Sequence, residues 1–507
     1  MMKNALITTF DKKDVDILAQ FLVDNGFRIF STGGTAKFLE DRGVEVTLIK
    51  DITEYPSILS GRVKTLHPTI FGGILADRER HKDEIKRYNL PLFDIVIVNL
   101  YPFEEVAKVA DASPAELIEN IDIGGVALIR AAAKNFSRVA VVVDKNDYET
   151  VKESIEEFGE VPYESRKRLA IKAFAYTSYY DSLISHRFGL DLFEEEYLTL
   201  PFKKPFPLRY GENPHQSGLL FKSALSDSGI PQGEILSGKP LSFNNIRDLD
   251  GALITLRDFP DAPCAVVLKH STPCGIATAE TIGKAYELAL ASDPLSAFGG
   301  IVGLNRRVDM ECAELLHKTH FLECIVAPDY TDEALELMKK KKNRRIIKLD
   351  VYKNIPEFDC KMVSDGLLVQ SRDRLEEKRE DFRIVTDRAP TEDEWESLLF
   401  AWRAVKSVKS NSVLLVKGTA TVGIGGGQTS RVDAAKIAVD KAGDRAKGSV
   451  AASDAFIPFP DALEVCAEAG ATAVIQPGGS KGDPQAIEAA NRYNIAMLFT
   501  GRRHFRH

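Results

Sequence analysis

Residues 27–43 read FRIFSTGGTAKFLEDRG, and this stretch decides the fold of the first part of the chain. An apolar strand, FRIFST, runs into two glycines, and the residues after them have the spacing of a helix that ends at Gly43. Such a turn leaves backbone N–H groups and a helix N-terminus open to an anion. A plain tight turn explains it equally well, because it matches neither the Walker A loop nor the dinucleotide fingerprint.

The same alternation of strand and helix continues on both sides of this stretch. ALITTF (5–10) and VEVTLI (44–49) are short strands, and KDVDILAQFLVDNG (13–26) has the pattern of an amphipathic helix. FDIVIVNL (93–100) and RVAVVV (138–143) are continuous apolar runs, as in strands that are covered on both faces. This order predicts an α/β domain with a parallel sheet, right-handed crossovers and ligands at the carboxyl ends of the strands.

A helical stretch from about 165 to 186 is followed by LPFKKPFPLRYGENPHQ (200–216), which is rich in proline. We therefore predict two domains, 1–195 and 196–507. ASDPLSAFGGIVGLN (291–305) resembles ASDAFIPFPD (452–461), and CIVAP (324–328) resembles AVIQP (473–477). This predicts two duplicated α/β subdomains, with chance similarity as the alternative. MKKKKNRRIIKLD (338–350) is expected to be a solvated helix end and turn.

The composition narrows the class of protein. The 507 residues suggest about two to four domains. With 66 basic against 74 acidic residues, the net charge of −8 argues against a general nucleic-acid binder. Six scattered cysteines without a Cys-x-x-Cys pair favour reduced thiols over a disulfide framework or zinc knuckle. The absence of a long apolar run or signal peptide predicts a cytoplasmic protein without membrane contact.

Polar motifs gather where the predicted strands of the first domain end. They are GRVKTLHP (61–68), VNLYPF (98–103) and IDIGGVALIRAAAKNF (121–136). Arg130 and Lys134 lie four residues apart, and a solvated helix face is the usual explanation for such a pair. The recurrence of lysines, a tyrosine, an aspartate and glycine-rich turns at strand ends nevertheless indicates a ligand site.

The second domain places two titratable groups side by side in VLKHSTPCG (267–275). Side chains of Lys269 and His270 would point to opposite faces of a regular strand. We expect the chain to leave the strand at Pro273 and Gly275, so that both groups turn toward one pocket. A strand end emerging into solvent is the alternative. Pro273-Cys274 lacks the second cysteine that zinc deaminases need, so no metal site is expected.

These motifs resemble a known family. STGGTA, GRVKTLHP, NLYPF and IDIGG…RAAAKN resemble the IMP cyclohydrolase domain of bifunctional purine biosynthesis enzymes, which has a methylglyoxal-synthase-like fold. SAFGGIVGLN, CIVAP, KSNSV, GIGGGQTSR, SDAFIPF, QPGGS and RRHFRH resemble the partner domain, AICAR formyltransferase (phosphoribosylaminoimidazolecarboxamide formyltransferase). The two halves of that domain resemble cytidine deaminase folds without the zinc. The resemblance covers essentially the whole chain.

The resemblance implies functional residues, position by position. It implies catalytic roles in ring closure and formyl transfer for Lys64, Tyr101, Asp122, Lys134, Lys269, His270, Asn411 and His507. It implies substrate binding in the first domain by Lys12, Thr32, Gly33, Gly34, Thr35, Arg62, Thr65 and Asn99. In the second domain it implies substrate binding by Arg209, Tyr210, His215, Gly299, Glu323, Arg431, Phe456 and Arg503.

Two positions differ from the family pattern, and one glycine-rich loop is a candidate phosphate site. Phe10 stands where the family often has a small hydroxyl residue, and Glu323 stands where some members have aspartate. The three glycines 425–427 together with Arg431 look like a backbone cradle and cation for a 5′-phosphate, with a plain glycine turn as the alternative.

The implied function is a bifunctional enzyme of IMP biosynthesis. A formyl group passes from 10-formyltetrahydrofolate to AICAR, and formyl-AICAR then closes to IMP with loss of water. His270 suits a general base and Lys269 a cation for the formyl oxygen. Asp122 would accept a proton during ring closure. The resemblance also implies a homodimer with the formyltransferase site at the subunit interface, folate as cosubstrate and no catalytic metal.

Two rival functions remain at this point. One is a related enzyme in which only one half is active. The other is a nucleotide-binding regulatory protein that kept the pockets and lost the chemistry. Lys64, Asp122, Lys269 and His270 count against both, because a pure binder has no need of proton-transfer groups.

Overall fold

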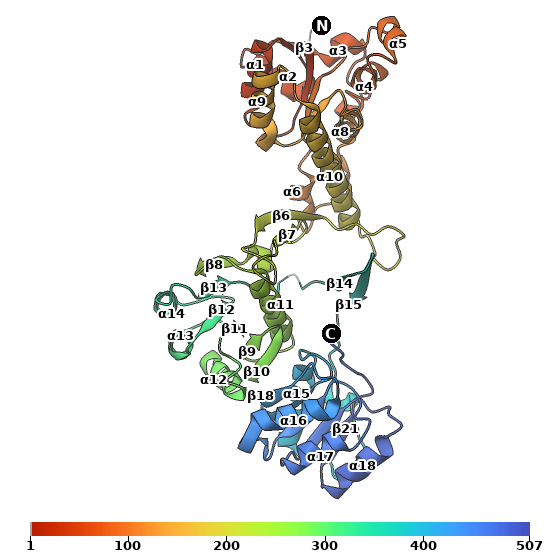
Figure 1. The fold of residues 1–507 in the computed structure, drawn as a ribbon. Coiled ribbons are helices and arrows are strands. Elements are labelled where there is room, and N and C mark those ends of the chain that lie inside the picture. Colours follow the sequence, from red (N-terminus) through yellow and green to blue (C-terminus); the bar gives the residue numbers. More distant parts are fainter. Residues whose placement is uncertain (1–2, 354) are drawn as a thin grey trace. The chain divides into compact units, whose positions relative to one another are not determined.

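The computed structural model describes residues 3–353 and 355–507, which form two compact units (Figure 1). The first unit runs to Lys203 and includes Ser223–Leu225, and the second comprises Lys204–Lys222 and Ser226–His507. This division lies a few residues after the predicted boundary at 195/196. The hairpin of β6 (Phe202–Pro207) and β7 (Leu219–Ser223) spans the division. The proline-rich stretch therefore contains a strand.

The first unit is built on a five-stranded sheet in which every neighbouring pair of strands is parallel. Its order is β3-β2-β1-β4-β5. The strands are β1 (Lys3–Thr8), β2 (Phe27–Ser31), β3 (Val46–Leu48), β4 (Ile95–Val98) and β5 (Ala140–Val142). The predicted parallel α/β domain is confirmed, and β4 and β5 are buried along their whole length, as their continuous apolar runs indicated.

Helices cover both faces of this sheet because residues alternate sides along each strand. Leu6, Val96 and Val98 pack with α4, α8 and α10, whereas Ala5, Ile7 and Ile97 pack with α1, α2 and α9. The helices are α1 (Val15–Asp24), α2 (Gly33–Glu40), α3 (Ile49–Thr53), α4 (Pro68–Leu75), α5 (Lys82–Arg87), α6 (Phe103–Ala107), α7 (Pro114–Glu119), α8 (Gly124–Lys134), α9 (Tyr148–Phe158) and α10 (Tyr163–Arg187).

The second unit contains a twelve-stranded mixed sheet, ordered β16-β21-β20-β19-β17-β18-β10-β9-β11-β12-β13-β8. Its first half comprises β8 (Glu234–Ser237), α11 (Phe243–Arg257), β9 (Cys264–Lys269), β10 (Thr272–Thr278), α12 (Ile282–Ser292), β11 (Gly300–Leu304), α13 (Met310–Lys318), β12 (Leu322–Ala327), α14 (Asp332–Lys339) and β13 (Arg345–Lys348).

The second half repeats the same succession of elements. It comprises β16 (Arg383–Ile384), α15 (Glu392–Val405), β17 (Val413–Lys417), β18 (Ala420–Gly425), α16 (Arg431–Ala442), β19 (Val450–Ser453), α17 (Asp461–Glu468), β20 (Ala473–Gln476), α18 (Asp483–Arg492) and β21 (Ala496–Phe499). Between the halves lies the hairpin of β14 (Phe358–Val363) and β15 (Gly366–Ser371).

Strand pairing allows the two halves to be compared. In the first half β9 pairs antiparallel with β10 and β11, and β11, β12 and β13 are successively parallel. In the second half β17 pairs antiparallel with β18 and β19, and β19, β20 and β21 are successively parallel. β10 and β18 join the halves. The two halves therefore share one pattern of strand pairing, and CIVAP and AVIQP lie on the corresponding strands β12 and β20.

One of the two sequence matches used for the duplication is out of register. The first Ala-Ser-Asp (291–293) ends α12 and precedes β11, whereas the second (452–454) ends β19, the counterpart of β11. The two triplets are therefore not equivalent positions. The basic stretch 338–350 also differs from expectation, because Arg344 and Arg345 are buried.

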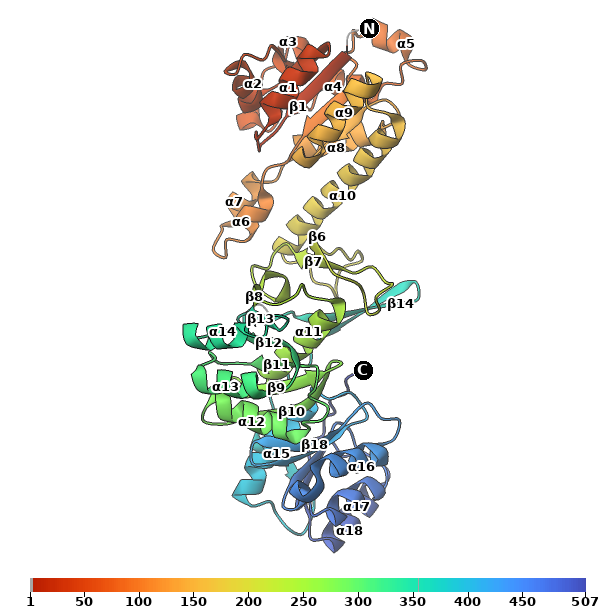
Figure 2. The ribbon, with the colours of Figure 1, turned by 60° about the vertical axis from the view of Figure 1, so that its left-hand side comes forward.

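The twelve-stranded sheet lies between two layers of helices. One core joins α11 and α15 with one face of both halves. The opposite face is covered by α12, α13 and α14 in the first half, which Figure 2 shows stacked along the strands, and by α16, α17 and α18 in the second. No helix among residues 3–353 and 355–507 has the length and apolar character required to cross a bilayer.

Glycines on β10 and β18 let helices approach these strands closely. A Cβ on Gly275 would lie 1.9 Å from the carbonyl oxygen of Ala289 in α12. A Cβ on Gly423 would lie 2.0 Å from the carbonyl oxygen of Ala438 in α16. Because backbone cannot move aside cheaply, alanine at either position must push a helix off the sheet.

We therefore expect Gly275→Ala to lower the free energy of unfolding of the second unit by about 1–3 kcal/mol, the usual cost of overpacking. Urea unfolding followed by circular dichroism measures this change. Gly366→Ala is the matched control, because its Cβ would meet Val363 at an ordinary 3.4 Å. Equal effects of the two substitutions would contradict the packing explanation.

Candidate active sites

Three strand ends of the first unit meet at one edge of its parallel sheet. The chain leaves β1 at Thr9–Lys12, β2 at Thr32–Gly34 and β4 at Asn99–Tyr101. Helix α2 begins at Gly33, directly after β2. Because β1 lies between β2 and β4, the polar groups predicted from separate motifs are brought to neighbouring positions.

Two lysines lie over the glycine turn at the start of α2. The Lys12 ammonium is 4.0 Å from where a Cβ of Gly34 would be, and the Lys64 ammonium is 3.7 Å from the corresponding position of Gly33. Gly61 lies against the stem of Lys64, since its Cβ would be 2.4 Å from Lys64 Cε. Two cations beside exposed N-terminal glycines of a helix are suited to an anion such as a phosphate.

Asp122 is the partly buried acid of this edge. Its Oδ1 accepts a hydrogen bond from the Gly125 N–H at 2.7 Å, and its carboxylate also accepts from the backbone N–H of Tyr101. Burial raises the pKa of Asp122 above its ordinary value, although these bonds and the nearby charge of Lys64 oppose the rise. A carboxylate that is harder to ionise and lies near a lysine has the character of a proton acceptor.

Two of the predicted ligands of this edge, Asn99 and Thr35, form hydrogen bonds to the backbone of the loop after β1. Asn99 Oδ1 accepts from the Phe10 and Asp11 N–H groups at 2.5 and 3.0 Å, and its Nδ2 donates to the Asp11 carbonyl at 2.9 Å. Thr35 is buried, and its hydroxyl accepts from the Thr9 N–H at 3.1 Å and donates to the Thr9 carbonyl at 2.9 Å. Both residues fix the loop after β1.

Of the remaining predicted residues of this edge, Arg62, Thr32 and Tyr101 are at least partly exposed, whereas Thr65 is buried. Arg62 forms an exposed ion pair with Glu119, and Thr65 Oγ1 lies 3.3 Å from where a Cβ of Gly124 would be. Thr32 is partly exposed at the N-cap of α2. The ring of Phe10, which departs from the family, packs edge-on against Tyr101 with 5.5 Å between centroids.

Lys134 does not join this group of side chains. It is exposed and is the last residue of α8, whereas Asp122 lies two residues before the start of that helix. An eleven-residue helix is about 16 Å long. The sequence placed both residues in one motif, and the helix between them separates their positions. A catalytic role for Lys134 stays a prediction.

In the second unit, Lys269 ends β9 and β10 begins at Thr272. The two connecting residues, His270 and Ser271, have left-handed backbone angles, with φ of 55° and 59°. The chain therefore turns earlier than predicted, and Pro273 and Gly275 lie inside β10 at a bulge. The expectation that the chain leaves the strand at Pro273 and Gly275 is therefore wrong, because the irregular backbone lies at His270 and Ser271 instead.

The turn is anchored from α11. Asp248 Oδ1 accepts from the Ser271 N–H at 2.6 Å and from the Ser271 hydroxyl at 3.2 Å. His270 is exposed, and Lys269 is half-buried with its ammonium donating to the Phe298 carbonyl at 2.8 Å. The sequence carried no signal for Asp248 as the partner of this turn.

The second half of the sheet provides an internal comparison. At the equivalent turn Lys417 donates to the Lys447 carbonyl at 3.2 Å, as Lys269 does to Phe298. The lysine-to-carbonyl contact is therefore part of the repeated scaffold. The left-handed residue after the lysine is Gly418, with φ of 61°, in the second half and His270 in the first. A histidine there carries a conformational cost that glycine avoids.

Asn411 and Arg431 belong to a buried cluster around Asp454. Arg431 Nη1 donates to the Ser453 hydroxyl at 2.8 Å and to Asp454 at 2.5 Å, and its Nη2 donates to Asn411 Oδ1 at 2.8 Å. Asn411 Nδ2 donates to the Gln428 carbonyl at 3.0 Å. Arg431 is only 8% exposed, so it holds Asn411 in place. The open cation of the predicted phosphate cradle is not seen here.

The glycines of that predicted cradle are required for packing. A Cβ on Gly425 would lie 2.0 Å from the Ala434 carbonyl oxygen, and one on Gly426 would lie 2.4 Å from a methyl carbon of Val408. Close packing is therefore sufficient to explain glycine at these two positions, as in the alternative of a plain glycine turn.

Other predicted residues of the second unit lie near its surface. Glu323 pairs with the buried Arg345, and Gly299 has φ of 74° with its N–H donating to the Phe321 carbonyl at 2.8 Å. The exposed or partly exposed members are Arg209, Tyr210, His215, Phe456, Arg503 and His507. The Arg209 guanidinium lies 5.1 Å from the Tyr210 ring centroid, and that of Arg503 lies 4.4 Å from the Phe505 centroid.

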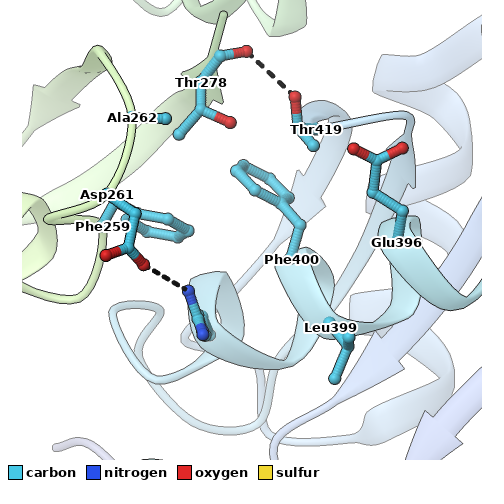
Figure 3. A pocket seen from close by; sticks show the side chains of 9 residues that line it. Phe259, Asp261, Ala262, Thr278, Glu396, Leu399, Phe400 and Thr419 are labelled. Carbon is cyan, nitrogen blue, oxygen red and sulfur yellow. Dashed lines mark hydrogen bonds and ion pairs between the residues drawn. The ribbon is translucent and has the colours of Figure 1, made fainter. Parts of the chain in front are cut away.

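A cavity of about 220 Å³ lies beside Thr419, at the turn between β17 and β18 (Figure 3). Phe259 and Phe400 form its apolar wall, and the ion pair of Asp261 with Arg403 lies at its rim. It contains none of the predicted site residues. No group of three or more His, Cys, Asp and Glu side chains that could hold a metal ion occurs in the described part of the chain.

A parallel sheet edge with an acid and two lysines in the first unit and a Lys-His turn in the second are typical of an enzyme, with one candidate site in each unit. Two family models match the chain: an MGS-like domain matches residues 15–127, and the AICARFT/IMPCHase bienzyme matches residues 132–441. The chain belongs to the AICARFT/IMPCHase bienzyme family.

Curated relatives match the chain along its whole length. The bifunctional purine biosynthesis protein PurH of Thermoanaerobacter sp. (strain X514) is 48% identical over 512 residues, covering 100% of both chains. The proteins of the same name from Caldicellulosiruptor saccharolyticus and Anoxybacillus flavithermus are each 47% identical with the same coverage. The family resemblance, the fold class and the paired activities of AICAR formyltransferase and IMP cyclohydrolase are therefore confirmed.

Proposed function

We propose that ring closure takes place at the edge of β1, β2 and β4, and that formyl transfer takes place at the β9–β10 turn with 10-formyltetrahydrofolate as the donor. One observation carries the assignment of the second centre. His270 occupies a left-handed position where the equivalent turn has Gly418. Strain of this kind persists where the side chain has a use.

Formyl transfer needs a base and a cation. The acceptor amine of AICAR is conjugated with an imidazole carboxamide, so its lone pair is a poor nucleophile. His270 takes the amine proton as the new N–C bond forms, and Lys269 stabilises the negative charge that develops on the formyl oxygen. The donor C–N bond then breaks, and the folate nitrogen leaves as an amine after it takes up the proton that His270 had accepted. The hydrogen bond from Lys269 to the Phe298 carbonyl supports a fixed position for this cation.

Ring closure needs an acceptor for the amide proton and donors for the formyl oxygen. The carboxamide nitrogen attacks the formyl carbon, a C–N bond forms, and the former formyl oxygen departs as water after protonation. Asp122 accepts the amide proton, and Lys64 stabilises the developing oxyanion. Lys12 and the N-terminus of α2 hold the phosphate. The closeness of Lys64 to both Gly33 and Asp122 supports this division of roles.

The remaining predicted ligands are assigned to the same two substrates. Tyr101, Thr32, Arg62 and Thr65 border the ring-closure edge, and Arg209, Tyr210, His215, Glu323, Phe456 and Arg503 are proposed to bind AICAR or folate. Ring closure removes formyl-AICAR, which draws the transfer step forward. This coupling gives a physical reason for keeping both activities on one chain.

A direct assay tests the proposal. Purified protein is supplied with AICAR and 10-formyltetrahydrofolate, and tetrahydrofolate and IMP are measured separately. Both products are expected. Tetrahydrofolate without IMP would leave only the transferase, and binding without turnover would favour a regulatory protein.

We also propose that the chain acts as a homodimer with the formyltransferase site at the subunit contact, as the family resemblance implies. Complementation between inactive variants tests this arrangement. If His270 and Asn411 act from different subunits, mixing His270→Ala and Asn411→Ala chains creates one intact site in each mixed dimer. Restored transfer supports the interface site, whereas mixed dimers without activity would oppose it.

A further inference from the structure

The segment 500–507, which follows β21, is held by a buried histidine. His504 is 2% exposed. Its Nδ1 lies 2.5 Å from Asp373 Oδ2, and its Nε2 lies 3.2 Å from Glu377 Oε2. The His504 ring packs against Trp402 with 4.8 Å between centroids. The two carboxylates come from residues 372–378, between β15 and β16, and are more than 120 residues away in sequence.

The pattern of contacts favours the imidazolium form. Only protonated histidine has a donor on each ring nitrogen, so only it can donate to both carboxylates. Burial by itself lowers the pKa of His504, but Asp373 and Glu377 outweigh it and raise the pKa above 6.5. The other charged groups on this side are Lys406, at the end of α15, and its partner Asp258, with 3.0 Å between their charged atoms.

The same segment supports the residues around Asn411. The His504 N–H donates to the Asp454 carbonyl at 2.9 Å, and Asp454 in turn binds Arg431, which holds Asn411. The Arg506 carbonyl accepts from the Ser410 N–H at 2.9 Å, and Arg506 Nη1 donates to the Ser407 carbonyl at 3.1 Å. Arg506 therefore contacts the chain just before Asn411, and His504 contacts Asp454, which accepts from the Ser412 N–H just after it.

We propose that His504 is a positioning residue for formyl transfer: as an imidazolium it ties segment 500–507 to residues 373–377 and so holds Asn411, Arg503 and His507 in their working positions. This inference rests on the proposed assignment of those three residues to the formyltransferase site. His504 touches no reacting atom in this role. The first unit shares none of these contacts, so ring closure is independent of the tether.

The direction of the pH effect follows from the raised pKa. The tether is complete below pH 6.5, where His504 is charged in both folded and unfolded chains, and it is lost as pH rises through the folded pKa. Above that pH the neutral ring has one N–H, so it can donate to only one of the two carboxylates. The buried Glu377 keeps one donor in either case, because Trp402 Nε1 also donates to its Oε2.

Trp402 provides a spectroscopic signature of the tether. The chain has two tryptophans, so the substitution Trp395→Phe leaves Trp402 as the one tryptophan that emits. Because a protonated imidazole in contact quenches indole emission, we expect fluorescence to rise with pH, with a midpoint above 6.5. Adding His504→Gln should remove the transition, and adding Asp373→Asn should move it to lower pH. If the fluorescence of the Trp395→Phe variant, with His504 intact, does not change with pH, the tether is overturned.

Kinetics test the positioning role. His504→Gln should lower kcat of formyl transfer on the order of ten- to a hundredfold, since misplacement of about 1 Å has effects of this size. Ring closure of supplied formyl-AICAR should stay at the wild-type rate, which shows that the chain is folded. Hydrogen exchange in residues 500–507 should quicken in this variant. His317→Gln, on the outer helix α13, is the matched control.

The outcomes separate this inference from the proposed function. If His504→Gln frees segment 500–507 but transfer continues at the wild-type rate, the positioning role is overturned. If transfer in wild type does not decline over the pH range of the fluorescence change, the role is likewise overturned. Failure of wild type to transfer the formyl group at any pH would instead count against the proposed transferase centre.

Discussion

His270→Ala is expected to lower kcat/KM of formyl transfer by roughly two to four orders of magnitude, the usual contribution of a positioned general base. Ring closure of supplied formyl-AICAR should be unchanged, because Asp122, Lys64 and α2 lie in the first unit. Single-turnover formation of formyl-AICAR from AICAR and the folate donor measures the loss directly.

The duplicated turn provides the matched control for this experiment. Lys269→Ala should impair transfer, whereas Lys417→Ala, which removes the same lysine-to-carbonyl contact in the second half, should leave transfer close to wild type. Equal losses in the two lysine variants would show that the contact is only structural. Retained transfer in His270→Ala would remove the histidine from the mechanism.

The same turn separates function from stability. His270→Gly places the residue of the equivalent turn at a φ of 55°, where glycine is unstrained. Its free energy of unfolding should rise by about 1 kcal/mol, the lower end of the cost of such strain, while transfer is lost. A variant that is both less stable and inactive would contradict the view that the strain is kept for catalysis.

Asp122→Asn is the second substitution with a large expected effect. It removes the proposed proton acceptor while keeping a group that can bind the Gly125 N–H, so ring closure should fall by roughly two to four orders of magnitude. Formyl transfer should continue, and formyl-AICAR should accumulate. Conversion of formyl-AICAR to IMP, followed by absorbance, measures the effect.

The pH dependence of ring closure follows from the raised pKa of Asp122. The carboxylate form accepts the proton, so activity should fall as pH decreases through the pKa of Asp122, which burial raises above 3.8. Asp181→Asn is the control, because burial also raises the pKa of Asp181 but that residue lies on α10, outside the site. An acid limb at or below 3.8 would argue for a different base.

In the first unit, periodicity predicted the five strands and helices α1, α2 and α10, whereas helices such as α5, α7 and α9 were not predicted. The strands are apolar and bounded by turn residues, and each is followed by a helix, so local patterns predict both the strands and their parallel order. The carboxyl edge then follows from topology, which is why Gly33, Lys64 and Asp122 could be grouped before the structure was known. Lys134 was grouped with them because the family resemblance implies a catalytic role for it, although α8 places it at the end of the helix far from Asp122.

For the second unit the sequence indicated a duplication but misplaced part of it. Apolar strands such as CIVAP and AVIQP occupy equivalent positions, whereas the two Ala-Ser-Asp triplets do not. Short polar triplets recur by chance and carry no information on which strand they end. The pairing of β10 with β18, which joins the halves, becomes visible only in the folded sheet.

By itself the sequence determined the two α/β units, the family and the chemical groups available to each centre, because these depend on local pattern and residue type. The tertiary structure alone decided which groups are free to act. It buried Arg431 against Asp454, bent His270 into a left-handed turn held by Asp248, and joined His504 to Asp373 across 131 residues. Such contacts form between segments that share no local pattern, so only the folded chain specifies them.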